Sequence, residues 1–141
     1  MRFQAYLRVL NDEASIRKLH QETNIPGSVI EPLKARPQGT EEMLWQWHSA
    51  KDDIDVAGID RGIKLLLARY RPFFEDIKRY RGPEADTYLE LVTYHGENEG
   101  SRGLYLSSET ISTLSELGAA LDNDCVYDVL NNFPKEFHAE K

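Results

Sequence analysis

The chain has 141 residues, of which 40% are hydrophobic and 29% charged, with a single cysteine and a formal net charge of −7. These values predict one globular domain and exclude a disordered chain and a disulfide framework. The negative charge argues against nucleic-acid binding, and no apolar run approaches the roughly 20 residues of a membrane-spanning helix. The first residues lack the apolar stretch of a secretory signal, so we expect a cytoplasmic protein.

The N-terminal part of the sequence predicts three strands and one helix. Alternating apolar residues predict a strand over 3–10. Asn11 or Asp12 is expected to cap the helix that follows, because their side-chain oxygens accept free amide protons of the first turn. Further strands are expected over 28–35, which a proline places at a sheet edge, and over 43–49.

The longest helical pattern in the chain covers residues 59–77. Its apolar residues recur at helical spacing and predict the main stripe of the core. Acidic residues at positions 52, 53 and 55 precede this pattern and suit the positive end of a helix dipole. Pro72 removes one backbone donor, so we expect a kink or two abutting helices there.

The C-terminal part predicts three strands and one helix. The strands are expected over 88–94, 104–106 and 119–127. The helix lies between the second and third of these strands, and Ser107 or Ser108 is expected to cap it.

The predicted elements follow the order β-α-β-β-α-β-β-α-β. This order predicts an α+β fold with a mostly antiparallel sheet and helices packed on one of its faces. We interpret residues 1–141 as a single domain in which residues 131–141 form a loosely packed tail.

Charge is unevenly divided along the chain. Residues 1–81 hold 14 basic and 12 acidic side chains, whereas residues 82–141 hold 3 basic and 12 acidic ones. The formal charges of the two parts are therefore +2 and −9. An acidic part of this kind repels nucleic acid and attracts basic surfaces.

Asp122 and Asp124 are two residues apart on the last predicted strand, so both side chains leave the same face, about 7 Å apart along the chain. With Asp128 close by, paired carboxylates could bind a divalent cation or exchange protons. In the alternative interpretation, Cys125 and its apolar neighbours face the core and the aspartates face water. No histidine, glutamate or glycine-rich loop near them completes a ligand set, so we predict neither a metal site nor a cofactor.

Trp45 and Trp47 share one face of their predicted strand and form a broad aromatic surface. Together with His48 and Tyr94 they are candidates to line a pocket, and core packing is the alternative. A further hypothesis is a hydrolase or metal-dependent enzyme that uses His48 with nearby aspartates. The chain has no G-x-S-x-G nucleophile motif to support it.

Short motifs from both ends of the chain are similar to one small bacterial family. They are Phe3-Gln4-Ala5-Tyr6-Leu7-Arg8-Val9, Pro37-Gln38-Gly39 with Trp47-His48-Ser49, and Leu117-Gly118-Ala119-Ala120-Leu121-Asp122-Asn123-Asp124. The chain resembles domain of unknown function 4279 over nearly its whole length. This resemblance implies one bacterial α+β domain and no catalytic residues, because the family has no assigned activity. Asn24-Ile25-Pro26 departs from it, since a glycine-containing helix stop is expected there.

We therefore expect a non-enzymatic binding protein of the bacterial immunity type, which neutralises a cognate toxin through an acidic surface. The expected toxin is nuclease-like and has a basic surface. Electrostatic attraction would mainly raise the association rate. The alternative is a sensor domain that binds a small molecule or peptide in a pocket lined by tryptophan and tyrosine. The immunity hypothesis requires the acids of the C-terminal part to gather on one exposed patch, and the expected interface acids are Glu97, Glu99, Asp122, Asp124 and Asp128.

Overall fold

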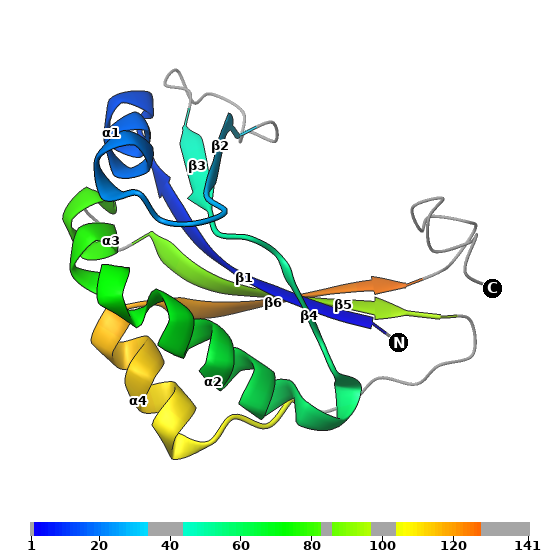
Figure 1. Cartoon of the computed structure of the whole chain (residues 1–141). Coiled ribbons are helices and arrows are strands. Elements are labelled where there is room, and N and C mark those ends of the chain that lie inside the picture. Colours follow the sequence, from blue (N-terminus) through cyan, green and yellow to red (C-terminus); the bar gives the residue numbers. More distant parts are fainter. Residues whose placement is uncertain (1, 34–43, 83–85, 97–103, 128–141) are drawn as a thin grey trace.

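The computed structural model describes residues 2–33, 44–82, 86–96 and 104–127. In this part of the chain, helices cover one face of an open, mixed six-stranded sheet (Figure 1). This arrangement confirms the predicted α+β fold. None of the described helices is long and apolar enough to cross a membrane.

The elements alternate between strands and helices along most of the chain. They are β1 (Arg2–Asn11), α1 (Glu13–Thr23), β2 (Val29–Pro32), β3 (Trp45–His48), β4 (Asp52–Ile54), a 3₁₀ turn (Val56–Gly58), α2 (Ile59–Tyr70), a second 3₁₀ turn (Arg71–Phe73), α3 (Phe74–Tyr80), β5 (Thr87–His95), α4 (Ser108–Leu117) and β6 (Ala120–Tyr127).

The sheet has the strand order β2-β3-β1-β5-β6, and β4 also pairs with β1. Strand β1 is therefore central, and it runs antiparallel to β3, β4 and β5. Only β6 is parallel to its neighbour β5. These two strands are joined through α4, because parallel neighbours need a crossover connection.

The core lies between the helices and the sheet. Alternate residues of β1 are buried beneath the helices, and these are Phe3, Ala5, Leu7 and Val9. The stripe of α2 that meets them consists of Ile63, Leu66, Leu67 and Tyr70, which recur at helical spacing. The predicted core stripe is therefore confirmed.

Local signals in the sequence place the ends of the helices. The Asp12 carboxylate accepts a hydrogen bond of 2.8 Å from the Ser15 N–H and so caps α1. Asn24 ends the same helix in the left-handed conformation, with φ 51°. Pro72 lies in the 3₁₀ turn that separates α2 from α3. The expected interruption of the helix at this proline is therefore confirmed.

Two predicted elements differ from the structure. Residues 52–54 form the short strand β4 opposite Phe3–Ala5, instead of the acidic start of a helix. Residues 104–106 are not a strand, and Leu104 and Leu106 pack against the core from an irregular segment. The predicted tail, 131–141, lies outside the described residues.

Candidate functional site

The helices lie on one face of the sheet (Figure 1), and we call the opposite side the open face. Among the described residues no helix covers it. Because side chains alternate along a strand, this face carries the residues of β1 and β5 that do not enter the helix-covered core. Tyr6 and Arg8 come from β1 and Glu90 from β5, and His48 on β3 lies opposite Arg8.

A row of polar side chains crosses five strands of the open face. The Gln46 amide donates to the Glu31 carboxylate, and the Arg8 Nε donates to Gln46 Oε1 over 2.9 Å. The Arg8 Nη1 donates to Glu90 Oε1 over 2.8 Å. Beyond Glu90, Asp122 on β6 occupies the paired position. Strand register alone brings these groups together, since they come from β2, β3, β1, β5 and β6.

Glu90 is the most deeply buried charged group of this row, with 1% of its surface exposed. Burial raises the pKa of the Glu90 carboxyl from 4.5 to about 7, and Asp122 adds to the rise, whereas Arg8 opposes it. The carboxyl therefore exchanges its proton near neutral pH.

Among the described residues, carboxyl groups outnumber cations at the β5–β6 end of the row. Oxygen atoms of Glu90, Asp122 and Asp124 all lie within 4.8 Å of one another. Arg8 is ion-paired with Glu90 alone among the three. We call these three residues the acidic cluster. Chemically it can hold a cationic group, either a divalent metal ion or the side chain of a lysine or arginine.

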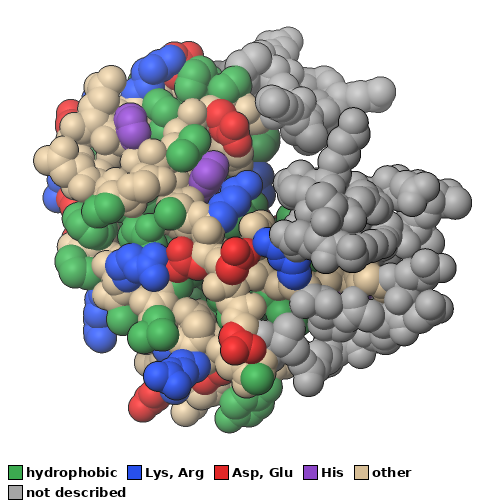
Figure 2. All heavy atoms as spheres, turned by 45° about the vertical axis from the view of Figure 1, so that its right-hand side comes forward, with side chains coloured by type: hydrophobic (Ala, Val, Ile, Leu, Met, Phe, Trp, Pro, Cys, Tyr) green, Lys and Arg blue, Asp and Glu red, His purple; other side chains and the backbone are tan. Residues whose placement is uncertain are grey.

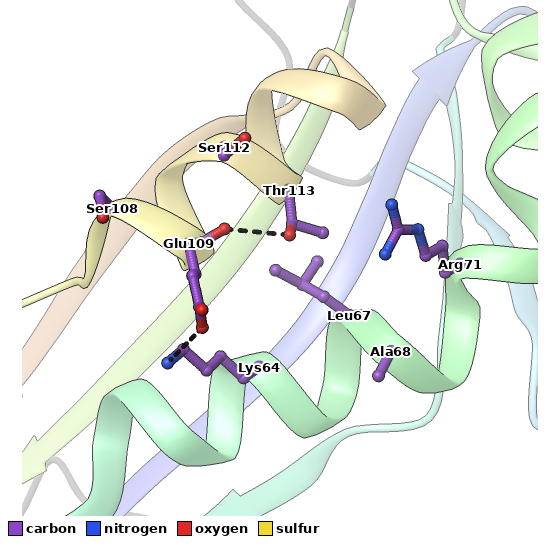
Figure 3. Close-up of a pocket in the computed structure, with 8 residues that line it drawn as sticks. All are labelled: Lys64, Leu67, Ala68, Arg71, Ser108, Glu109, Ser112 and Thr113. Carbon is purple, nitrogen blue, oxygen red and sulfur yellow. Dashed lines mark hydrogen bonds and ion pairs between the residues drawn. The ribbon is translucent and has the colours of Figure 1, made fainter.

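Acidic residues on the helix side are neutralised locally. Glu109 pairs with Lys64 at 3.1 Å, and Glu116 pairs with Arg71 at 3.0 Å. A hollow of about 640 Å³ lies between α2 and α4 near these pairs (Figure 3). Lys64 and Glu109 both line it and pair with each other, and Arg71, which also lines it, pairs with Glu116, so each of these cations already has an acidic partner.

Another part of the surface also mixes the two signs of charge. On the side drawn in Figure 2, acidic and basic side chains alternate, and no broad area of one sign is visible. Arg69, for example, pairs with Asp52 at 2.8 Å, and Arg2 lies 3.6 Å from Asp53. Among the described acids of residues 82–141, Glu90, Asp122 and Asp124 are the three that lie together in one group.

Of the expected interface acids, Asp122 and Asp124 share the open face. Glu97, Glu99 and Asp128 lie outside the described residues. Cys125 is exposed on β6, so the interpretation that places its side chain in the core was wrong. The reason is that β6 is the last strand of the sheet order and is covered on fewer sides than β5.

The four candidate pocket residues lie on two faces of the sheet. Trp47 is fully buried in the core, and Trp45 packs against that core with the Arg17 guanidinium 4.7 Å above its ring. His48 and Tyr94 belong to the open face, opposite Arg8 and Arg2 of β1. The four side chains therefore do not line one common pocket.

His48 has structural contacts on the open face. Its ring meets that of Tyr6 edge-on at 5.5 Å, and its Nδ1 lies 2.8 Å from the backbone oxygen of Ser49. The Ser49 hydroxyl accepts from the Leu7 N–H at 2.9 Å and donates to the Ala50 carbonyl. This serine therefore joins β1 to the segment between β3 and β4 and is not oriented toward the histidine.

Glu90 and Arg8 are the site residues that the sequence interpretation missed. A signal for Glu90 was present, because a single glutamate stands inside an otherwise apolar strand, where both faces carry bulky groups. Charged residues are rarely buried without a partner, so this position alone predicts a buried cation nearby. Arg8 supplies that cation from the neighbouring strand.

Comparison with known proteins identifies the family. A model of domain of unknown function 4279 matches residues 1–128, and the chain belongs to this family. No curated protein and no solved structure matches the chain.

Proposed function

We propose that this protein is a non-enzymatic binding protein of the bacterial immunity type, which neutralises a cognate toxin by covering its basic surface. The proposed contact surface is the β5–β6 end of the open face. The observation that most supports it is the acidic cluster, in which the carboxyl groups of Glu90, Asp122 and Asp124 converge with Arg8 as the paired cation.

The physical argument concerns the charge that this cluster leaves unbalanced. Neighbouring carboxylates repel one another, and burial makes the ionised form of Glu90 costly. A lysine or arginine of a partner would relieve both effects by a charge-assisted hydrogen bond. Tyr88 and Tyr94 are half-buried on the same face and are suitable aromatic anchors beside that contact.

Partner capture tests the proposal directly. The wild-type chain, an Asp122→Lys/Asp124→Lys variant and a Glu13→Lys/Glu75→Lys control are immobilised, and proteins from the source cells are passed over each. The control changes the net charge equally on exposed helix residues that lie away from the open face. We expect a basic toxin to be retained by the wild type and the control and lost with the cluster variant.

Salt dependence and cell survival complete this test. The affinity of the captured protein should fall steeply between about 50 and 500 mM salt, because screening weakens attraction between exposed charges. Co-expression of the wild type, but not of the cluster variant, should protect cells from the captured toxin. Equal retention by the cluster variant, or an affinity that ignores salt, would contradict the proposal.

A further inference from the structure

The outer edge of β6 offers a specific way for a basic partner to bind. We propose that the partner adds an extended strand to this edge and that the added strand carries basic residues opposite Asp122 and Asp124. The inference rests on the proposed function and adds the mode of binding. Strand addition of this kind obtains affinity from main-chain hydrogen bonds and specificity from alternate side chains.

The two ends of the sheet differ in their ability to accept another strand. Strand β2 has four residues and ends at Pro32, which has no N–H to donate. Strand β6 has eight residues, Ala120–Tyr127, without proline, glycine or lysine. Within the described part of the chain, no strand pairs with its outer side. Short length and proline are devices that block edge pairing, and β6 has neither.

Side chains of β6 form two differently composed rows. Asp122 and Asp124 lie opposite Glu90 and Val92 on the open face. Leu121, 37% exposed, and the exposed Cys125 lie on the other face, opposite Leu89 and Thr93. An added strand presents its side chains with the same alternation beside these rows. Basic residues therefore suit one row, and apolar residues suit the other.

Charge decides between a second copy of the chain and a different partner. If two copies paired through β6, both pairs of aspartates would lie on the same face of the continuous sheet, close to one another. Like charges directly opposite one another destabilise strand pairing. A basic strand instead supplies the counter-charges that Asp122 and Asp124 lack in the row described above. Charge complementarity thus favours a basic partner over self-association.

Amide hydrogen exchange of the full-length protein tests the inference. In a parallel pair, alternate residues of the edge strand direct their N–H groups away from the neighbour, so alternate β6 amides should exchange fast in the free protein. The probe is a capped peptide of alternating lysine and valine. We expect it to slow these outward amides at least about tenfold, since new backbone hydrogen bonds protect them.

Matched controls separate strand addition from general charge attraction. A glutamate–valine peptide of the same length should have no effect on the β6 amides. The lysine–valine peptide should also have no effect on an Asp122→Asn/Asp124→Asn variant, whereas a Glu13→Gln/Glu75→Gln variant should respond like the wild type. Circular dichroism confirms that each variant is folded before exchange is measured.

Failure of the inference is distinguishable from failure of the proposed function. If the outward β6 amides are already protected in the free protein, the edge is covered and the inference is wrong, although partner capture can still succeed. The inference is also wrong if the peptide binds through the aspartates without slowing these amides, or if it does not bind. Equal capture by the charge-reversed variant, or an affinity of the captured protein that ignores salt, would instead contradict the proposed function.

Discussion

Arg8 of β1 and Glu90 of β5 form an ion pair of 2.8 Å at the middle of the open face, where their side chains are 22% and 2% exposed. The pair is unequal, because the arginine reaches solvent and the glutamate does not. Glu90 is therefore the group whose protonation responds most to its surroundings.

Replacing Glu90 with glutamine should change how stability depends on pH. The folded protein holds the Glu90 proton up to a pKa of about 7, above the ordinary value of 4.5. The group's contribution to the free energy of unfolding is thus fully present below pH 4.5 and is lost as pH rises to about 7. Between the two ends of this range the wild type should lose this contribution, whereas Glu90→Gln should not. The free energy of unfolding of the variant should therefore rise by about 2–3 kcal/mol relative to that of the wild type. Urea unfolding at both ends measures it.

Glu75→Gln is the control for this experiment, since the Glu75 side chain is 85% exposed. The free energy of unfolding of this variant should change with pH as that of the wild type does. If the free energy of unfolding of Glu90→Gln had the same pH dependence as that of the wild type, the Glu90 carboxyl would have an ordinary pKa and the prediction would be wrong.

Removing Arg8 should be more costly at high pH than at low pH. Arg8→Met leaves the ionised Glu90 without its cation, and we expect a loss of about 2–3 kcal/mol above the glutamate's pKa. Well below that pKa the carboxyl is protonated and the loss should be smaller. A double-mutant cycle with Glu90→Gln measures the coupling. A coupling energy that does not change with pH would argue against the ion pair.

Asn24 should tolerate glycine and reject β-branched residues. Its φ of 51° is in the left-handed region, where the steric cost of an ordinary side chain is about 1–2 kcal/mol and glycine has no such steric cost. We expect Asn24→Gly to keep or slightly raise the midpoint of thermal unfolding and Asn24→Val to lower it. Gln21→Val, within α1, serves as the control and should cost under about 0.7 kcal/mol.

Replacing Gly62 with alanine should destabilise the protein, although Gly62 lies inside a helix. A Cβ at this position would lie 2.6 Å from Ile54 Cγ2 of β4. The clash should outweigh the gain of about 1 kcal/mol in helix propensity, for a net loss of about 1–2 kcal/mol. In an Ile54→Ala background the same substitution should be stabilising. Equal effects in both backgrounds would show that the contact does not limit this position.

The strands and helices with strong periodicity were predictable from the sequence. The alternation in β1 and the helical stripe of α2 each reflect one buried face, which the residue pattern records directly. Strand β4 was missed because three residues, Asp52–Ile54, are too few to show alternation. The parallel pairing of β6 with β5 depends on the order of strands in space, which no local pattern contains.

The candidate site was predictable only within single strands. Asp122 and Asp124 were expected on one face because side chains alternate along a strand. Their meeting with Glu90 follows from the register between β5 and β6, and the Arg8 contact follows from the register between β1 and β5. Register is set by packing across the whole sheet, so residues distant in sequence could not be assigned to one cluster in advance.

The central position of β1 has a consequence for synthesis of the protein. Arg8 pairs with His48 on one side and with Tyr88 on the other, so the ribosome makes β1 well before either neighbour. At translation speeds of roughly 5–20 residues per second, the nascent segment waits for seconds with its apolar side chains unburied and its main-chain groups without their strand partners. Newly made chains should therefore be clients of ribosome-associated chaperones until β5 emerges.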